Sequence, residues 1–285
     1  MKNYIVIFSL LAGSPLAAQY YYSDIVGSRE TSELHKSYQA AGVRTVQATG
    51  VDGNGVRASD FSEFQQYTAN GTTLKKTVIN QQTRVVNYYR FDANNRVVEI
   101  IDSSADVQAR AEYSYDAAGR ISQIRRSQLD TASEFNQVEL HQWTYKPDGQ
   151  PASMLRTIND ADSLEIKFTY DENGNPGEEI HYRRNIEVDH IYYYFDEEHR
   201  LTDLVRYDKK IKKLIPENIF SYDDAGRVIQ KLNRAPADNY GKVLWVGYFI
   251  WRYIYDSRGL KVKEALFDND RNLMGKIEYS YTTNK

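Results

Sequence analysis

The feature that most constrains the fold of this chain is a repeat of paired aromatic residues. Each pair is an aromatic-x-aromatic triplet, and the second members follow one another at intervals of 24 to 33 residues. A period of that length indicates one supersecondary unit stacked many times. The eight pairs are Tyr89/Phe91, Tyr113/Tyr115, Trp143/Tyr145, Phe168/Tyr170, Tyr193/Phe195, Phe220/Tyr222, Tyr253/Tyr255 and Tyr279/Tyr281.

A turn motif, Asp-x-x-Gly, follows most of these pairs. Aspartate at the first turn position accepts hydrogen bonds from the turn backbone, and glycine at the fourth takes a positive φ without steric cost. Asn95 and His199 stand at two of the glycine positions. The motif therefore predicts a tight connection between two antiparallel strands. Its structural residues are Asp92, Asp116, Gly119, Asp171, Gly174, Asp196, Asp223, Gly226, Asp256 and Gly259.

The strand pattern predicts an all-β fold. Because strand side chains alternate, both aromatics of a pair face the same side, and the mostly polar or small residues between them face the other. After each turn the apolar residues recur at a spacing of three, which indicates a bulge or a strong twist in each second strand. We therefore expect a repetitive antiparallel hairpin meander, curled into a spiral or barrel-like shape so that the aromatic residues form its core.

The chain divides into three segments. Residues 1–18 read as a signal peptide, residues 19–64 as an N-terminal cap segment, and residues 65–285 as the repeat domain. In the cap segment, Thr31 starts a short predicted helix through Gly42, and residues 43–64 form a first hairpin. A helix at that place would cover the sheet edge and the end of the core. The stretch 243–255 is apolar on both faces and predicts a strand that is covered on both sides.

The N-terminal residues indicate export. Lys2 precedes the apolar run 4–12, and small residues follow near Ala18. That run is too short to cross a bilayer, for which about 20 residues are needed. The expected location is the periplasm, the outer-membrane surface or the medium. The near balance of 36 basic and 39 acidic residues, with a net charge of -3, gives no electrostatic footprint for nucleic acid, and the short basic run at residues 209–213 is interpreted as a solvated loop. Charges on both strand faces also disfavour a transmembrane barrel, so we expect a protein that does not span the membrane.

The sequence aromatic-x-Tyr-Asp-x-x-Gly-Arg-hydrophobic resembles the YD repeats of the Rhs family. The match is good at residues 113–121 and 220–228, and the resemblance covers roughly residues 65–285. In large Rhs and insecticidal-toxin shells such repeats build a spiralling antiparallel sheet that can enclose a toxin domain. This chain has far fewer repeats and is similar in organisation to the small secreted YD-repeat proteins of Bacteroidota.

No pattern predicts catalysis, a cofactor or a metal. The five histidines lack metal-ligand spacing, and there is no nucleophile elbow and no glycine-rich phosphate loop. The absence of cysteine excludes thiol catalysis and thiolate ligands. Repeated Asp and Arg residues at the turns are interpreted as turn chemistry with weak ion pairing, rather than as calcium sites.

Binding is the function that the sequence favours. Tyrosines outside the aromatic pairs could form stacking platforms, although exposed tyrosines are also common on ordinary sheets. Uneven loops at residues 129–135, 208–213 and 235–241 are a second candidate surface. We expect a non-enzymatic binding or scaffold module of the cell envelope whose partner is a glycan or another envelope or secreted protein. The alternative is an Rhs-like shell fragment or a glycan-active protein that works with a partner polypeptide. The candidate ligand-contact residues are Tyr88, Tyr182, Tyr192, Tyr194, Tyr207 and Tyr240.

Overall fold

The computed structural model describes residues 20–103, 107–130, 135–208, 211–234 and 247–283. Among them are one helix, α1 (Ser23–Ala40), and eighteen strands. The first nine strands are β1 (Val43–Asp52), β2 (Arg57–Tyr67), β3 (Thr73–Asn80), β4 (Thr83–Phe91), β5 (Val97–Ser103), β6 (Val107–Tyr115), β7 (Ile121–Asp130), β8 (Phe135–Tyr145) and β9 (Pro151–Ile158). The others are β10 (Asp162–Tyr170), β11 (Pro176–Arg183), β12 (Ile186–Phe195), β13 (Leu201–Asp208), β14 (Lys213–Tyr222), β15 (Val228–Arg234), β16 (Tyr248–Tyr255), β17 (Lys261–Phe267) and β18 (Leu273–Thr283).

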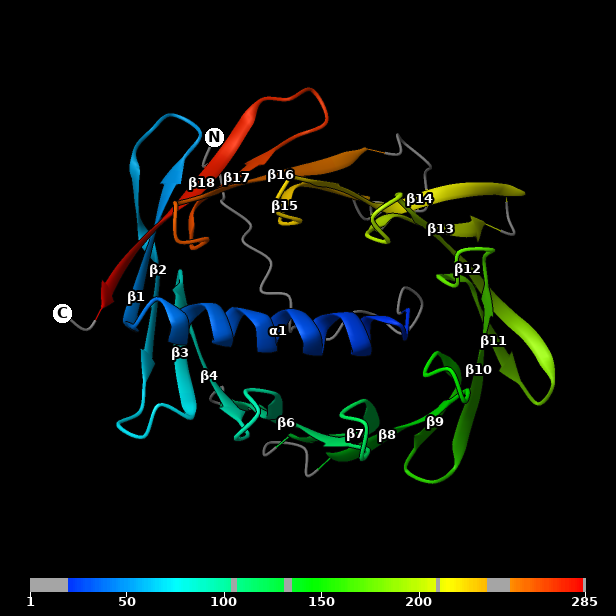
Figure 1. Cartoon of the computed structure of the whole chain (residues 1–285). Coiled ribbons are helices and arrows are strands. Elements are labelled where there is room, and N and C mark those ends of the chain that lie inside the picture. Colours follow the sequence, from blue (N-terminus) through cyan, green and yellow to red (C-terminus); the bar gives the residue numbers. More distant parts are fainter. Residues whose placement is uncertain (1–19, 104–106, 131–134, 209–210, 235–246, 284–285) are drawn as a thin grey trace.

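The strands form one closed antiparallel barrel. Each strand pairs with the next along the chain, and β1 also pairs with β18, from Val43 opposite Thr283 to Asp52 opposite Gly275. The barrel is an oval ring when viewed along its axis (Figure 1). Closure removes the exposed edges that an open sheet would leave.

This closure corrects the expected shape. The all-β class is right, but the prediction of a spiral meander with a helical cap is wrong, because β1 completes the ring with β18. The closing strands are the first and the last of the chain. A repeat pattern describes only neighbouring strands, so it contains no signal for a pairing across more than 200 residues.

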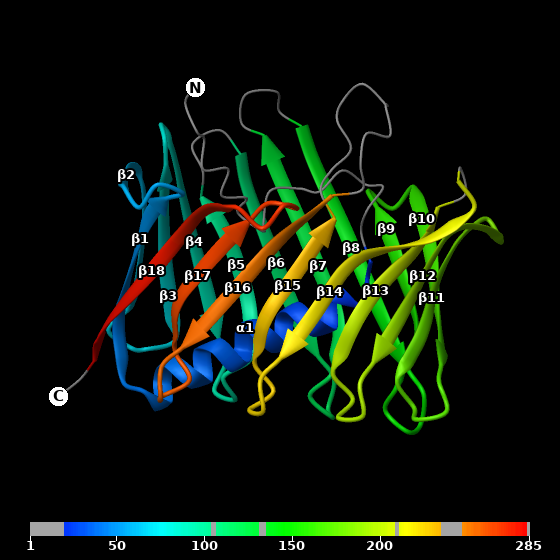
Figure 2. The same cartoon turned by 90° about the horizontal axis from the view of Figure 1, so that it is seen from above.

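The Asp-x-x-Gly turns gather at one end of the barrel, called the turn end here, and the opposite end is the loop end (Figure 2). Asp116 Oδ1 accepts hydrogen bonds from the backbone N–H groups of Ala118 and Arg120 at 3.0 and 2.9 Å. The same pattern recurs at Asp92, Asp171, Asp196, Asp223 and Asp256. Gly119, Gly174, Gly226 and Gly259 have φ of 79°, 80°, 75° and 80°, and Asn95 and His199 have φ of 61°.

Each of these turns is followed by a bulge in the second strand. In the hairpin of β4 and β5, Phe91 pairs with Val97 but Arg90 pairs with Glu99, so Val98 is the extra residue. The same register shift occurs in the other five Asp-turn hairpins and in the hairpin of β8 and β9, whose turn begins with Lys146. The bulge inferred from the spacing of three is confirmed. Because a bulge bends a strand and increases its twist, a bulge in every repeat helps to curl the sheet into a ring.

In six of the eight pairs the second aromatic is a tyrosine whose hydroxyl ties one repeat to the one before it. Tyr145 donates a hydrogen bond through its hydroxyl to the carbonyl of Ile121 at 2.7 Å. The guanidinium of Arg120, which is held by the turn carboxylate of Asp116, lies 4.4 Å from the Tyr145 ring centre. Equivalent hydroxyl contacts join Tyr115 to Val97, Tyr170 to Pro151, Tyr222 to Leu201, Tyr255 to Val228 and Tyr281 to Lys261.

The helix lies inside the barrel and not over its edge. Figure 1 shows α1 crossing the ring from the side of β9 to β12 to the side of β1 to β3, and Figure 2 shows it in the half nearer the turn end. It begins at Ser23, eight residues before the predicted start at Thr31. Its buried residues are Asp24, Ser28, Ser32, His35 and Tyr38, so a mostly polar stripe faces the wall. Because these buried residues are mostly polar, the sequence shows no apolar helical periodicity that begins at residue 23. The predicted helix therefore starts too late, at Thr31.

The aromatic pairs form the core between the wall and α1, as the sequence indicated. Trp143 and Phe168 pack with Ile124, Met154 and Tyr21 in one cluster, and Phe91 and Leu74 pack with Tyr38 in another. Strand β16 is less covered than predicted, because Ile254 on its outer face is 53% exposed and Tyr253 on its inner face is partly exposed. No helical segment within the described ranges has the length and hydropathy to span a lipid bilayer. The predicted signal peptide lies outside the described residues.

Candidate functional site

The N-terminus of α1 is capped by a carboxylate of the barrel wall. The N-cap residue Tyr22 makes no side-chain capping hydrogen bond. Instead, Glu179 on the inner face of β11 accepts from the backbone N–H of Tyr21 at 2.7 Å and of Tyr22 at 2.9 Å. It also accepts from the Tyr193 hydroxyl at 2.6 Å, and its Oε1 lies 2.6 Å from His181 Nε2. A negative charge at this position also interacts favourably with the helix dipole.

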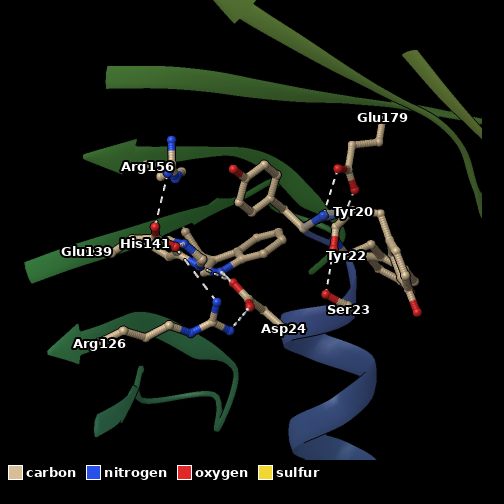
Figure 3. A network of polar contacts seen from close by, with 11 residues as sticks. Tyr20, Tyr22, Ser23, Asp24, Arg126, Glu139, His141, Arg156 and Glu179 are labelled. Atoms are coloured by element: carbon tan, nitrogen blue, oxygen red, sulfur yellow. Dashed lines mark hydrogen bonds and ion pairs between the residues drawn. The ribbon is translucent and has the colours of Figure 1, made fainter. Parts of the chain in front are cut away.

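A second carboxylate, on the helix itself, enters a polar network on β7 to β9 (Figure 3). Asp24 is 3% exposed, and its oxygens lie 2.8 Å from Arg126 Nη2, 2.6 Å from His141 Nδ1 and 3.3 Å from Trp143 Nε1. Glu139 continues the network, with Oε1 2.7 Å from His141 Nε2 and Oε2 3.1 Å from Arg156 Nη2. We call Glu179 and the Asp24 network together the α1 latch.

The ring of His141 is doubly protonated in this arrangement. Both nitrogens point at carboxylate oxygens, and carboxylates only accept hydrogen bonds, so both ring nitrogens donate. Burial alone would lower the pKa of His141, but the charge of Asp24 and hydrogen bonds to both carboxylates raise it above its ordinary value.

The pKa values of the two carboxyl groups, Asp24 and Glu139, shift in the opposite direction from that of His141. Burial alone would raise the pKa of Asp24, but the charges of His141 and Arg126, with hydrogen bonds from His141 and Trp143, hold it below its ordinary value. The pKa of Glu139 falls to about 2, because contacts with His141 and Arg156 outweigh the effect of burial. The latch is therefore a set of mutually compensated charges at neutral pH.

The C-terminal half of α1 docks through rings and backbone contacts. His35 stacks on Phe91 with ring centres 3.7 Å apart, and its Nδ1 lies 2.8 Å from the Tyr67 hydroxyl. Ser32 Oγ accepts from the backbone N–H of Val97 at 3.1 Å. Gly42, with φ of 62°, then allows the chain to enter β1 directly after the helix.

This arrangement suits docking and does not supply catalytic groups. His141 has no free nitrogen to act as a base or ligand, and Glu179 and Asp24 are saturated with hydrogen bonds. Within the described ranges no three His, Cys, Asp or Glu side chains are grouped in a way that could hold a metal ion. The α1 latch was missed by the sequence analysis, because its members come from α1, β7, β8, β9 and β11. One signal was present in the sequence: on these strands, single charged residues occupy positions where the alternation would place an inward-facing apolar residue.

Four of the six candidate tyrosines lie on the outer wall of three adjacent strands. Tyr182 lies on β11, Tyr192 and Tyr194 on β12, and Tyr207 on β13, all at positions that alternate with the inward-facing residues. Tyr192 pairs with Val205, which is only 6% exposed although it faces outward. Tyr207 follows Val205 by two positions on the same face of β13, and His190 stacks on Tyr192 with ring centres 4.3 Å apart. We call the four tyrosines the outer tyrosine face.

Carboxylates lie between these rings. Glu178 pairs with Tyr192 and Asp203 pairs with Tyr194, while Tyr182 pairs with Glu165 on one side and Glu187 on the other. The Tyr194 side chain is 48% exposed. Burial raises the pKa of Tyr192, and the nearby charges of Glu178 and Glu187 raise it further.

The remaining two candidate tyrosines do not join this surface. Tyr88 lies on the outer face of β4, where Lys75 Nζ is 5.7 Å from its ring centre. Tyr240 lies outside the described residues. The turn aspartates and glycines are at the turn end (Figure 2), and Tyr194 lies close to them, two residues before Asp196. Tyr182 and Tyr207 lie near the opposite ends of their strands.

Comparison with known proteins gives no family. No protein-family model matches the chain, and no curated protein matches it. Among solved structures, a chain of the Photorhabdus luminescens Tc holotoxin pore is 14% identical with a TM-score of 0.35, and the match covers 78% of this chain but 12% of that one. A porin-like protein of Bacteroides uniformis is 8% identical with a TM-score of 0.38, covering 84% of this chain and 98% of that one. A porin-like protein of Bacteroides vulgatus is 13% identical with a TM-score of 0.23, covering 85% and 99%. Similarities this low carry no argument about function.

Proposed function

We propose that this chain is an exported, non-enzymatic binding module of the cell envelope that recognises a carbohydrate through the outer tyrosine face. The observation that carries the proposal is that Tyr182, Tyr192, Tyr194 and Tyr207 all lie on the outer face of three adjacent strands. The leader-like residues 1–18 and the resemblance to YD repeats support export and an envelope role.

The chemistry of this face favours a hydroxyl-rich ligand without negative charge. Tyrosine offers an apolar ring face and a polar hydroxyl, which suits the mixed surface of a sugar. Glu178 and Asp203 accept hydrogen bonds beside the rings and repel anions. A neutral or amino sugar therefore fits better than a phosphate-bearing polymer.

The rest of the outer wall suits a protein surrounded by water. Arg90, Glu99, Arg110, Glu112 and Arg125 form a continuous chain of ion pairs across the middle of β4 to β7. Such charges differ from the apolar outer band of a barrel in contact with lipid. The binding surface is thus proposed to lie in an aqueous compartment.

The interior supports a binding role over the alternative of a shell fragment. A shell that encloses part of another polypeptide needs an interior open to that partner. Here α1 crosses the interior, and the α1 latch holds it with Asp24 and Glu179 buried. The barrel therefore accommodates a segment of its own chain.

Sedimentation with two insoluble uncharged polysaccharides, chitin and cellulose, tests the proposal. The wild-type protein should co-sediment with one of them, and the double variant Tyr194→Ala/Tyr207→Ala should bind at least tenfold more weakly. Loss of one base or sugar stacking contact of this kind costs about 1–3 kcal/mol, which sets that scale. Tyr88→Ala is the matched control and should bind as the wild type does. Equal binding by the double variant and the wild type would contradict the proposal.

A further inference from the structure

The interior of the barrel is filled unevenly around α1. The buried core residues on the inner wall lie mainly on β1, β3 to β5, β7 to β10, β12 and β13. Across the helix, inner-wall residues of β14 to β16 keep part of their surface exposed, namely Phe220, Lys231, Trp251 and Tyr253. The helix thus packs tightly on one side only.

Three residues of α1 line the less filled side. Gly27, Glu30 and Leu34 follow at helical spacing and form one stripe, which points away from the buried residues Ser28, Ser32 and His35. A Cβ added at Gly27 would meet no atom of the described residues within 4 Å. Leu34 is 45% exposed although α1 lies inside the ring.

Two charged groups influence each other on this side of α1. Glu30 is exposed to solvent, yet burial raises the pKa of its carboxyl group, and the charge of Lys231 is the main opposing influence. Burial likewise lowers the pKa of Lys231 on β15, with Glu30 as the opposing charge. Glu30 on α1 and Lys231 on the wall therefore lie within electrostatic reach of each other, which places the stripe opposite β15.

The polar groups in this space lack strong partners. In the described part of the chain, Lys231 and Glu30 influence each other electrostatically but form no ion pair within 4.0 Å. Lys231 Nζ lies 5.3 Å from the ring centre of Phe220, so its nearest defined contact is an aromatic ring. The cation is therefore available to an anion that enters the space.

We propose that this space, between the Gly27–Glu30–Leu34 stripe and the inner wall of β14 to β16, binds an amphipathic carboxylate such as a medium-chain fatty acid. The carboxylate pairs with Lys231, and the aliphatic chain contacts Leu34, Phe220 and Trp251. A protonated Glu30 can donate a hydrogen bond to the same head group. This site is separate from the outer tyrosine face, which lies on the other side of the wall.

Titration calorimetry of the full chain with dodecanoate, and with dodecanol as the uncharged probe, tests the site. The wild-type protein should bind dodecanoate in a 1:1 complex. Lys231→Met keeps most of the side-chain length and should weaken dodecanoate binding about tenfold, without a comparable effect on dodecanol. Lys263→Met on the outer face of β17 is the control and should change neither affinity.

A second variant tests the space itself. Gly27→Leu places a side chain in the open volume and should abolish the binding of both probes. Leucine also has a higher helix propensity than glycine, so α1 should remain folded, as an unchanged circular dichroism spectrum would verify. The proposal is overturned if the wild-type protein binds no dodecanoate, if Lys231→Met binds it as tightly as the wild type, or if Gly27→Leu retains full affinity.

Discussion

At the scale of single residues, Glu179 joins the start of α1 to the barrel wall through four contacts. It is completely buried and receives two backbone N–H groups of the helix start, the Tyr193 hydroxyl and His181. A buried group of this kind is costly to disturb, because its partners cannot turn to water instead.

Glu179→Gln should lower the free energy of unfolding by about 3 kcal/mol, because the new amide NH2 faces N–H donors and the charge that pairs with His181 is lost. Urea denaturation followed by circular dichroism measures the change. The neighbouring Glu178→Gln, on the outer face, should change it by no more than about 0.5 kcal/mol. Similar values for the two variants would show that Glu179 does not anchor α1.

The turn residues could be predicted one by one from the sequence, whereas Glu179 and Asp24 could not. Asp116 and Gly119 act within five residues of chain, so their pattern is visible locally. Asp24 meets His141 across 117 residues, and Tyr21 meets Glu179 across 158. A single charged residue in a strand looks the same in the sequence whether it faces solvent or a buried partner.

At the scale of elements, α1 depends on the charge state of its latch. The carboxyl groups of Asp24 and Glu139 have lowered pKa values in the folded protein, that of Glu139 being about 2. Their stabilising contribution is therefore complete above about pH 4.5 and is lost as the pH falls toward 2. His141 has a raised pKa, so its contribution is complete below about pH 6.5 and is lost as the pH rises through its folded value.

The melting temperature of the wild-type protein should therefore be highest between about pH 4.5 and 6.5 and should decrease on both sides. In His141→Gln the decrease on the alkaline side should become shallower, because the group responsible for it is absent. Differential scanning calorimetry from pH 3 to pH 9 makes the comparison. His190→Gln, on the outer wall, serves as the control. An alkaline limb of unchanged slope in His141→Gln would contradict the assignment of a doubly protonated ring.

The strands were easier to predict than the helix for a physical reason. Aromatic pairs such as Tyr113/Tyr115 show the period of two of a strand directly in the sequence. The bulge after each turn appears as a change in the spacing of the apolar residues. The helix buries Asp24, Ser28, Ser32 and His35, whose burial depends on partners supplied by the wall. Its position inside the ring follows from those partners and not from an apolar stripe.

At the scale of the whole molecule, the barrel joins a repetitive wall to a segment that is not repetitive. The Asp turns, the bulges and the tyrosine hydroxyls recur around the ring, and they fix how each hairpin follows the previous one. The closing pair of β1 and β18 and the latched helix occur once each, and they decide that the sheet is a barrel with a defined interior. Both the outer tyrosine face and the proposed interior site depend on that closure.

The closure is tested most directly by a disulfide across β1 and β18. The chain has no cysteine, so Gln47→Cys/Ser280→Cys introduces a single pair of thiols, at exposed residues that lie opposite each other. Directly opposed strand residues have the spacing that a disulfide requires. Gln47→Cys/Phe64→Cys joins β1 to β2 and should cross-link in an open or a closed sheet alike. For a closed barrel, mild oxidation of the folded protein should leave no free thiol in either variant. Free thiols that persist in the Gln47/Ser280 variant, while the Gln47/Phe64 variant is fully oxidised, would contradict closure.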